Sequence, residues 1–295
     1  MSAFAPTSFD NRCYAIHETL TNFFDNHCNR HLALLSTYFL FSFALYLRGH
    51  EIGDMRMSTQ SKTRFSTKNF ILNALANEDY QHLHPHLKEV EVLLGQELYQ
   101  PFEAIRYAYF PNSSMVSVIA VTLDGQNAET GVIGREGIVG FNVLMGVDST
   151  PNLYLVQRAD SALRISTEAI RHEFNRGGAF QRIALRYMHA MMTQIGQTAL
   201  CNVRHIVEQR LARWLLVCHD RGDGDELSLT QEFLSIMLGV NRPAVTRAAL
   251  VLQGGGLIKY VRGSITVTDR EGLEDFSCNC YELVKQEYDK LKTFF

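Results

Sequence analysis

Hydrophobic and polar residues follow three successive patterns along this chain of 295 residues. From about Asn69 to His86, apolar residues recur at mixed three- and four-residue spacings, which predicts a helix. From Val90 to Ile165, short runs rich in β-branched and aromatic residues alternate with turn sequences, which predicts strands. Helical spacing returns from Phe180. The order indicates an α+β fold.

The strand region predicts an antiparallel β-roll of the jelly-roll type, because short strands joined by tight turns are typical of that architecture. Five segments are predicted as strands: Val90–Leu94, Ala104–Tyr109, Ser114–Leu123, Glu129–Ile133 and Tyr154–Ile165.

A long helix is predicted from Phe180 to Val203, and a further helix from Ile206 to His219. Five residues of the long helix repeat at alternating four- and three-residue spacing, the pattern of a helix that packs along a partner. They are Ala184, Met188, Met191, Ile195 and Thr198. The same stripe could pack on the roll, but a helix of about 24 residues is roughly 36 Å long. We therefore predict a homodimer through this seam.

Two further short helices are predicted on either side of Gly239. Thr230 is a suitable N-cap for a helix beginning at Gln231, and glycine permits the left-handed conformation that ends it. Asn241 caps the next helix, and Pro243 lies in its first turn, where no intrahelical N–H is required. The pattern predicts a helix-turn-helix.

Residues after the second helix predict a β-hairpin, or wing, formed by Leu257–Val261 and Ser264–Thr268. The second helix would enter the DNA major groove with its N-terminal residues. There Arg242 and Arg247 can each offer two donors to guanine. The complete set of predicted DNA contacts is Thr230, Asn241, Arg242, Pro243, Thr246, Arg247, Lys259 and Arg262.

Charge supports this assignment by its distribution, since the net charge of −3 is uninformative. No Asp or Glu occurs from Phe233 to Thr268, whereas seven acids and four bases follow from Asp269 onward. A basic island in a mildly acidic chain is expected of a phosphate-binding surface.

The six cysteines are scattered, and Cys278 and Cys280 are the one close pair. No pair of these cysteines has the C-x-x-C spacing that is typical of a metal site. We therefore expect reduced thiols in a cytoplasmic protein, and no cofactor. A redox role for Cys278 and Cys280 is an alternative.

The N-terminal segment contains an apolar run from Leu32 to Leu47. The run has about 16 residues, fewer than the ~20 of a membrane-spanning helix. Three interpretations remain: a membrane anchor, a buried or interfacial helix, or an untranslated segment preceding a start at Met55 or Met57. We favour the last and expect no membrane partner. The alternative function is a membrane-attached sensor.

Two segments, LTQEFLSIMLGVNRPAVTRAALVLQGGGLI and VIGREGIVGFNVLMG, resemble the Crp/Fnr superfamily of bacterial transcription regulators. The resemblance covers residues 70–270. It implies a dimer that binds a pseudo-palindromic site in duplex DNA, with RNA polymerase as a candidate partner. Arg242 and Arg247 match the family's base-reading arginines. Pro243 stands where many members carry a base-contacting glutamate, so we expect a different target sequence.

The resemblance also suggests the domain bounds. We expect an N-terminal extension over residues 1–68, the roll over 69–178, a dimerisation helix over 179–204, the winged helix-turn-helix over 205–270 and a helical tail over 271–295.

The family's cyclic-nucleotide binders hold ribose with a Gly-Glu pair and phosphate with a following arginine. Here the matching residues are Gly140-Phe141 and Thr150-Pro151-Asn152. Phe141 cannot accept a hydrogen bond and neither Pro151 nor Asn152 is charged, so we predict no cyclic-nucleotide binding and an unknown small-molecule effector.

Other activities of the resembling proteins are not expected here. Cys13 and Cys28 are too few for an iron–sulfur cluster. The alternate histidines His82, His84 and His86 are interpreted as part of a solvated polar segment, in preference to haem ligands. No nucleophile elbow, phosphate loop, dinucleotide fingerprint or zinc-protease motif indicates an enzyme.

Overall fold

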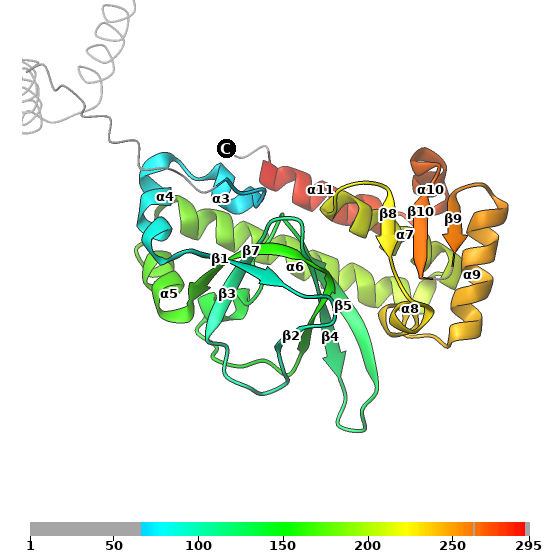
Figure 1. Cartoon of the computed structure of the whole chain (residues 1–295), viewed down its shortest axis with the longest axis horizontal. Coiled ribbons are helices and arrows are strands. Elements are labelled where there is room, and N and C mark those ends of the chain that lie inside the picture. The colour runs from blue at the N-terminus through cyan, green and yellow to red at the C-terminus, as the bar shows by residue number, and fades with distance from the viewer. Residues whose placement is uncertain (1–65, 262, 293–295) are drawn as a thin grey trace, which may run out of the picture. The chain divides into compact units, whose positions relative to one another are not determined.

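A computed structural model of the chain describes residues 66–261 and 263–292. Those residues form a β-roll, a long helix and a winged helix-turn-helix (Figure 1). The apolar run 32–47, Cys13, Cys28 and Arg262 lie outside the described residues, as do Met55 and Met57. Among the helices that are described, none has the length and apolar content to cross a membrane.

The predicted helix at 69–86 is interrupted. It consists of α3 (Phe70–Ala74), α4 (Asn77–Leu83) and a 3₁₀ turn, η1 (His84–His86). Leu75, between α3 and α4, has an extended backbone and a buried side chain. Leu75 is buried together with Ile71 and Leu72 of α3, so all three contribute to the core of the roll.

The roll consists of two antiparallel sheets, in the orders β1-β7-β3 and β2-β6-β4-β5. Their strands are β1 (Lys88–Val92), β2 (Glu97–Tyr99), β3 (Tyr107–Pro111), β4 (Met115–Val121), β5 (Asn127–Ile133), β6 (Leu153–Arg158) and β7 (Asp160–Ser166). The predicted single strand Tyr154–Ile165 is wrong, because Ala159 separates β6 from β7 and the two belong to different sheets. The predicted α+β fold with a roll is confirmed.

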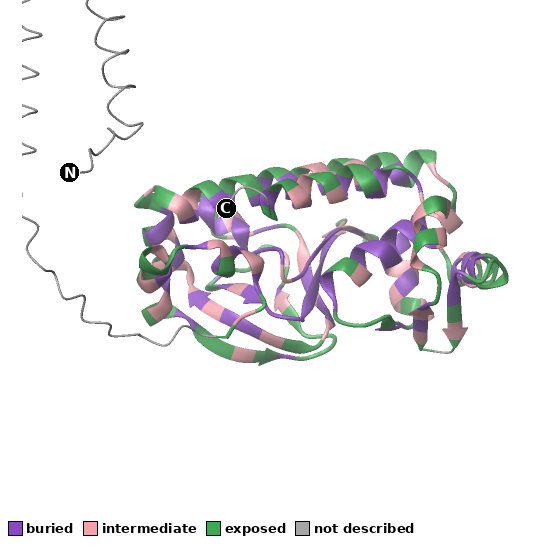
Figure 2. Ribbon diagram, turned by 90° about the horizontal axis from the view of Figure 1, so that it is seen from above, coloured by how far each residue is buried: buried purple, intermediate pink, exposed green. Residues whose placement is uncertain are grey.

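Three helices follow the roll: α5 (Thr167–Asn175), the long α6 (Gly178–Arg204) and α7 (Val207–Arg221). Figure 2 shows α6 along one edge of the molecule, with one face buried and the other exposed.

The prediction that a second copy packs on the seam of α6 is wrong, because the seam residues are not available at the surface of the single chain. Ala184, Met188, Met191 and Thr198 are buried inside this one chain, and Ile195 packs partly buried against the same core. The cause is that the a/d spacing of a partner seam equals the spacing of a stripe packed on its own domain. The tail helix α11 (Cys280–Lys292) adds Val284, Tyr288 and Leu291 to this core, so it covers α6 as well.

The remaining elements form the winged helix-turn-helix and the tail. They are β8 (Glu226–Ser228), α8 (Gln231–Leu238), α9 (Arg242–Gly254), β9 (Ile258–Val261), β10 (Ser264–Val267) and α10 (Arg270–Phe276). The wing is a three-stranded sheet in the order β8-β10-β9, so β8 is a strand that the sequence did not predict. The core of the winged helix-turn-helix includes Trp214, Leu234 and Val245, and this core is continuous with Met115 and Val132 of the roll.

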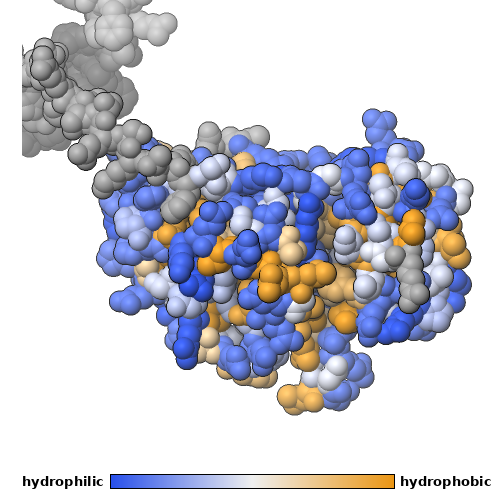
Figure 3. Space-filling view, in the orientation of Figure 1, coloured by the Kyte–Doolittle hydropathy of each residue, from blue (hydrophilic) through white to orange (hydrophobic). Residues whose placement is uncertain are grey.

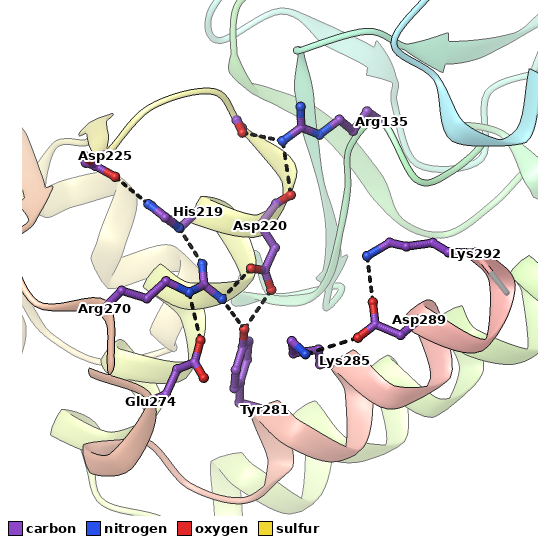
Figure 4. A network of polar contacts seen from close by, with 11 residues as sticks. Arg135, His219, Asp220, Asp225, Arg270, Glu274, Tyr281, Lys285, Asp289 and Lys292 are labelled. Atoms are coloured by element: carbon purple, nitrogen blue, oxygen red, sulfur yellow. Dashed lines mark hydrogen bonds and ion pairs between the residues drawn. The ribbon is translucent and has the colours of Figure 1, made fainter. Parts of the chain in front are cut away.

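A polar network fastens the tail to the end of α7 (Figure 4). The Arg270 guanidinium donates to Glu274 and Asp220, at 2.8 and 2.7 Å, and to the hydroxyl of Tyr281. The Tyr281 hydroxyl in turn donates to Asp220. Residues from α7, α10 and α11 are thereby held together.

The outer surface is mostly hydrophilic in the view of Figure 3, with apolar patches over the roll and at the tip of the β4–β5 hairpin. Leu123, in that turn, is fully exposed.

Candidate nucleic-acid interface

Local capping sets the ends of the two helices of the helix-turn-helix. The Thr230 hydroxyl accepts from the backbone N–H of Phe233 at 3.1 Å, as predicted for the N-cap of α8. Gly239 ends α8 with φ of 61°, in the left-handed region that favours glycine. The Asn241 side chain accepts from Ala244 N at 3.0 Å and caps α9. Both predicted helices therefore have the expected bounds.

The second helix, α9, has one buried and one exposed face. Val245, Ala248, Ala249 and Leu252 are fully buried. Residues on the opposite face are free for contact with another molecule: Arg242, Pro243, Arg247 and Leu250 are exposed, and Thr246 is half-buried. Leu250 was missed by the sequence reasoning, although its position four residues after Thr246 places it on the same face.

Two of the predicted DNA-binding side chains at the start of α9, those of Arg242 and Thr246, already have partners within the chain. Arg242 Nη2 lies 2.7 Å from Glu232 Oε1, and both side chains are exposed. The Thr246 hydroxyl donates to the backbone oxygen of Arg242 at 3.1 Å. Glu232 also escaped the sequence reasoning, because it belongs to α8 and precedes the acid-free stretch.

Arg247 differs from Arg242, since it has no ion-pair partner within the described part of the chain. Its exposed guanidinium keeps all its donors available, and it follows Thr246 on the outward face of α9. This arrangement can supply two parallel N–H donors to a planar acceptor pair such as guanine O6 and N7.

The wing is fixed to both helices through Tyr260 of β9. Its hydroxyl accepts from Gln231 Nε2 at 2.6 Å, and its backbone N–H donates to the side chain of Gln253 at 2.8 Å. Lys259 is exposed on the neighbouring position of the strand. Lys259 and α9 thus belong to one rigid unit, whereas Arg262 lies outside the described residues.

The segment of the roll that matches the family's cyclic-nucleotide residues contains a buried phenylalanine. Gly140 has φ of 85° and precedes the short helix η2 (Phe141–Met145). Phe141 is buried and packs edge-on against Tyr187 of α6, with ring centroids 5.9 Å apart. Thr150 is also buried. A side chain that fills space stands where the ribose-binding carboxylate is expected.

Four side chains that can ligate a metal meet where α6 ends and the tail begins its return. Cys201, His205, Cys278 and Cys280 place one ligand atom each within 4.8 Å of one another. The sequence reasoning treated these cysteines as scattered. The available indications were the four-residue spacing of Cys201 and His205 on one helix and the C-x-C pair.

Comparison with known proteins places the helix-turn-helix in a family. Residues 209–276 match the family model of the Crp-like helix-turn-helix domain. No curated protein sequence matches the chain.

Solved structures share the fold of the described region. FixK2 from Bradyrhizobium japonicum superposes with a TM-score of 0.57 at 16% identity, covering 65% of this chain and 98% of that one. A CooA mutant from Carboxydothermus hydrogenoformans has a TM-score of 0.53 at 17% identity, covering 74% and 99%. A CRP-family transcriptional regulator from Thermus thermophilus, TTHB099, has a TM-score of 0.52 at 18% identity, covering 64% and 96%.

Proposed function

Because the chain carries a Crp-like helix-turn-helix domain and has the fold of Crp/Fnr regulators, we propose that it is a dimeric, sequence-specific DNA-binding transcription regulator. The observation that carries the proposal is the exposed N-terminal half of α9 on a rigid winged scaffold. Such a helix can enter the major groove with its first residues. We place its action in the cytoplasm, where it has access to the DNA.

Arg247 is the principal base reader in this proposal, with Arg242 as the second. Each good bidentate contact to guanine discriminates against a wrong base by about 1–3 kcal/mol. Arg242 must first leave Glu232, and an exposed ion pair of this kind is worth at most about 1 kcal/mol. Pro243 has no acceptor for a cytosine amino group, so the target differs from that of relatives with glutamate there.

Contacts to the DNA backbone come from the edges of the same surface. The N-termini of α8 and α9, at Thr230 and Asn241, present backbone N–H groups that suit phosphate oxygens. Lys259 in the wing supplies positive charge, and Arg262 follows it three residues later in the sequence. These contacts fix the position of the protein on the duplex and carry no sequence information.

We propose that two copies pair through α6, along a stripe one residue away from the predicted seam. The stripe consists of Leu185, His189, Met192, Gly196, Ala199 and Val203, all exposed in the single chain. Their spacing alternates between four and three residues, as in a helix pair. Gly196 and Ala199 are small enough for the two helices to approach closely.

Pairing along this stripe would give a two-fold symmetric protein. Its two recognition helices would then contact half-sites about 34 Å apart, one turn of DNA. A signal received by the roll would act by changing the relation between α6 and the helix-turn-helix.

The roll is proposed to respond to something other than cyclic AMP or cyclic GMP. Phe141 occupies the position of the ribose acceptor and is in contact with Tyr187 of α6. Phe141 supplies no carboxylate for ribose, and neither Pro151 nor Asn152, at the matching positions, supplies a positive charge for phosphate. Titration calorimetry with either nucleotide is expected to show no heat of binding; micromolar affinity would contradict the proposal.

A binding experiment with two variants tests the groove assignment. Arg247→Ala is expected to bring the affinity for a selected site down to that for unrelated DNA. Lys259→Ala is expected to weaken binding to every sequence about equally and to lower its salt dependence. Arg106→Ala, which removes an exposed arginine of the roll, is the matched control and should bind as the parent does. Wild-type binding by both test variants would show that α9 and the wing do not contact DNA.

A further inference from the structure

Three cysteines and one histidine form a compact cluster where the long helix ends. Cys201 lies in the last turn of α6, and His205 is its C-cap residue. Cys278 lies between α10 and α11, and Cys280 is the first residue of α11. The three thiols are buried and His205 is partly buried.

The distances within the cluster fit a single tetrahedral ion. The Sγ atoms of Cys201 and Cys278 are 3.4 Å apart, and Cys280 Sγ is 3.7 Å from His205 Nδ1. Zn²⁺ with thiolate bonds of about 2.3 Å and imidazole bonds of about 2.0–2.1 Å separates its tetrahedral ligand atoms by roughly 3.5–3.8 Å. The four ligand atoms, all within 4.8 Å of one another, therefore need only small adjustments to surround zinc.

The charge around the cluster also matches a zinc–thiolate centre. Three thiolates, one neutral imidazole and Zn²⁺ carry a net charge of −1. Arg210 and Arg213 are buried and have no ion-pair partner among the described residues, and the Nε atom of each has no hydrogen-bond acceptor. Arg213 interacts electrostatically with all three thiols, and Arg210 with those of Cys201 and Cys278. Buried guanidinium groups require compensating negative charge, and the net charge of −1 on the loaded centre would offset part of their two positive charges.

We propose that Cys201, His205, Cys278 and Cys280 form a structural zinc site. The ligand set, Cys₃His, is one that structural zinc sites use. A disulfide between Cys201 and Cys278 would leave Cys280 and His205 without a role. An iron–sulfur cluster distributes its ligands over several iron atoms and would spread them further apart than a single ion does.

The position of the site gives it a consequence for the helix-turn-helix. His205 and Ile206 make up the whole connection between α6 and α7. Two of the other three ligands, Cys278 and Cys280, flank Asn279 in the tail. Zinc would hold this connection to the tail segment. Arg210, beside the cluster, also donates a hydrogen bond to the backbone oxygen of Leu238 at the end of α8. The site therefore fixes the direction in which the DNA-binding unit leaves the long helix.

Metal analysis of the full chain, purified under reducing conditions with zinc present, tests the proposal directly. We expect about one equivalent of zinc per chain. Cobalt substitution should give the thiolate charge-transfer absorption and the visible bands of a tetrahedral ion. Cys278→Ser and Cys280→Ser should each lose the bound metal, whereas Cys218→Ser, which changes a buried cysteine of another core, should keep it.

A ligand exchange distinguishes coordination from a general effect on folding. His205→Cys would create a Cys₄ site and should retain zinc with a stronger cobalt charge-transfer band, whereas His205→Ala should lose it. A chelator should lower the unfolding temperature of the parent protein and leave that of Cys278→Ser unchanged. Absence of zinc and of cobalt binding in the reduced parent protein would overturn the proposal. So would a Cys201–Cys278 disulfide in protein isolated with zinc present.

Discussion

Arg221, in the last turn of α7, forms a buried ion pair with Glu136 in the turn after β5, with 2.7 Å between Nε and Oε1. The same guanidinium donates to the side chain of Gln194 in α6 and lies over the ring of Tyr288 in α11, 4.8 Å from its centroid. Gly134 permits this approach, because a Cβ at that position would lie 2.7 Å from Cβ of Arg221. One side chain thus joins the roll, the long helix and the tail to the helix that precedes the DNA-binding unit.

Removing one partner of this pair should destabilise the protein strongly. Arg221→Met would leave the Glu136 carboxylate buried without compensation, at a cost of about 3–5 kcal/mol in the free energy of unfolding. Adding Glu136→Gln to Arg221→Met should recover a large part of that loss. Urea unfolding of the two single variants and the double variant measures the coupling. Simple additivity of the two losses would show that the pair is not coupled.

A second buried carboxylate makes stability depend on pH. Trp214 Nε1 of α7 donates to Glu129 Oε1 of β5 at 2.6 Å, and burial raises the pKa of Glu129 to about 7. An unfolded glutamate has a pKa of about 4.3, so the folded state holds this proton more tightly. The favourable contribution is complete below the unfolded pKa and is lost as the pH rises through about 7.

Glu129→Gln should therefore gain stability relative to the parent protein as the pH rises from 5 to 8, by at most about 3 kcal/mol. The amide keeps an oxygen that accepts from Trp214. Urea unfolding of the two proteins at each pH isolates the contribution of this group, because other titrating groups cancel in the difference. A difference that does not change with pH would contradict a proton on Glu129.

Neighbouring methionines of α6 should have opposite roles. Met192, on the exposed stripe, is proposed to contact a second copy, whereas Met191 is buried in the core of its own chain. Met192→Glu should convert the dimer to a folded monomer in sedimentation experiments. Met191→Ala should leave the dimer intact and lower the free energy of unfolding by about 2–5 kcal/mol.

Leu123→Glu is the control for the dimer experiment, because Leu123 is a fully exposed apolar residue away from the stripe. It should remain dimeric. A dimer that survives Met192→Glu would place the contact between copies elsewhere.

Glu232 should weaken DNA binding, since it pairs with Arg242 and places a negative charge beside the phosphates. Glu232→Gln is expected to increase affinity up to about fivefold at low salt, in line with the modest value of an exposed ion pair. Fluorescence anisotropy with a labelled duplex measures the change. Unchanged or weaker binding would show that Arg242 does not leave Glu232 to reach DNA.

Sequence alone predicted the helix-turn-helix to the residue, because its ends depend on local interactions. Thr230 and Asn241 cap helices within three residues of themselves, and Gly239 supplies a conformation that other residues adopt at a cost. Longer-range features were predicted less well. The break at Ala159 depends on which sheet each half of the segment joins, and no local pattern determines that.

Two errors concern side chains whose partners lie elsewhere in the chain. The spacing on α6 predicted a stripe but could not decide which of two adjacent stripes is covered by the roll and α11. The thiols of Cys201 and Cys278 are 77 positions apart in sequence, and the fold of the tail brings them together. A site formed by residues that are far apart in sequence can be recognised only in the three-dimensional structure.

Selection of bound duplexes from a random pool by the full chain would show whether a dimer reads DNA with two copies of α9. If a dimer reads DNA with two copies of α9, the enriched sequences should contain two inverted half-sites whose centres are about 10 base pairs apart. The Arg247→Ala variant should enrich no such sequence. Enrichment of a single unsymmetric element, or of nothing by the parent protein, would show that the protein does not read DNA with two paired α9 helices.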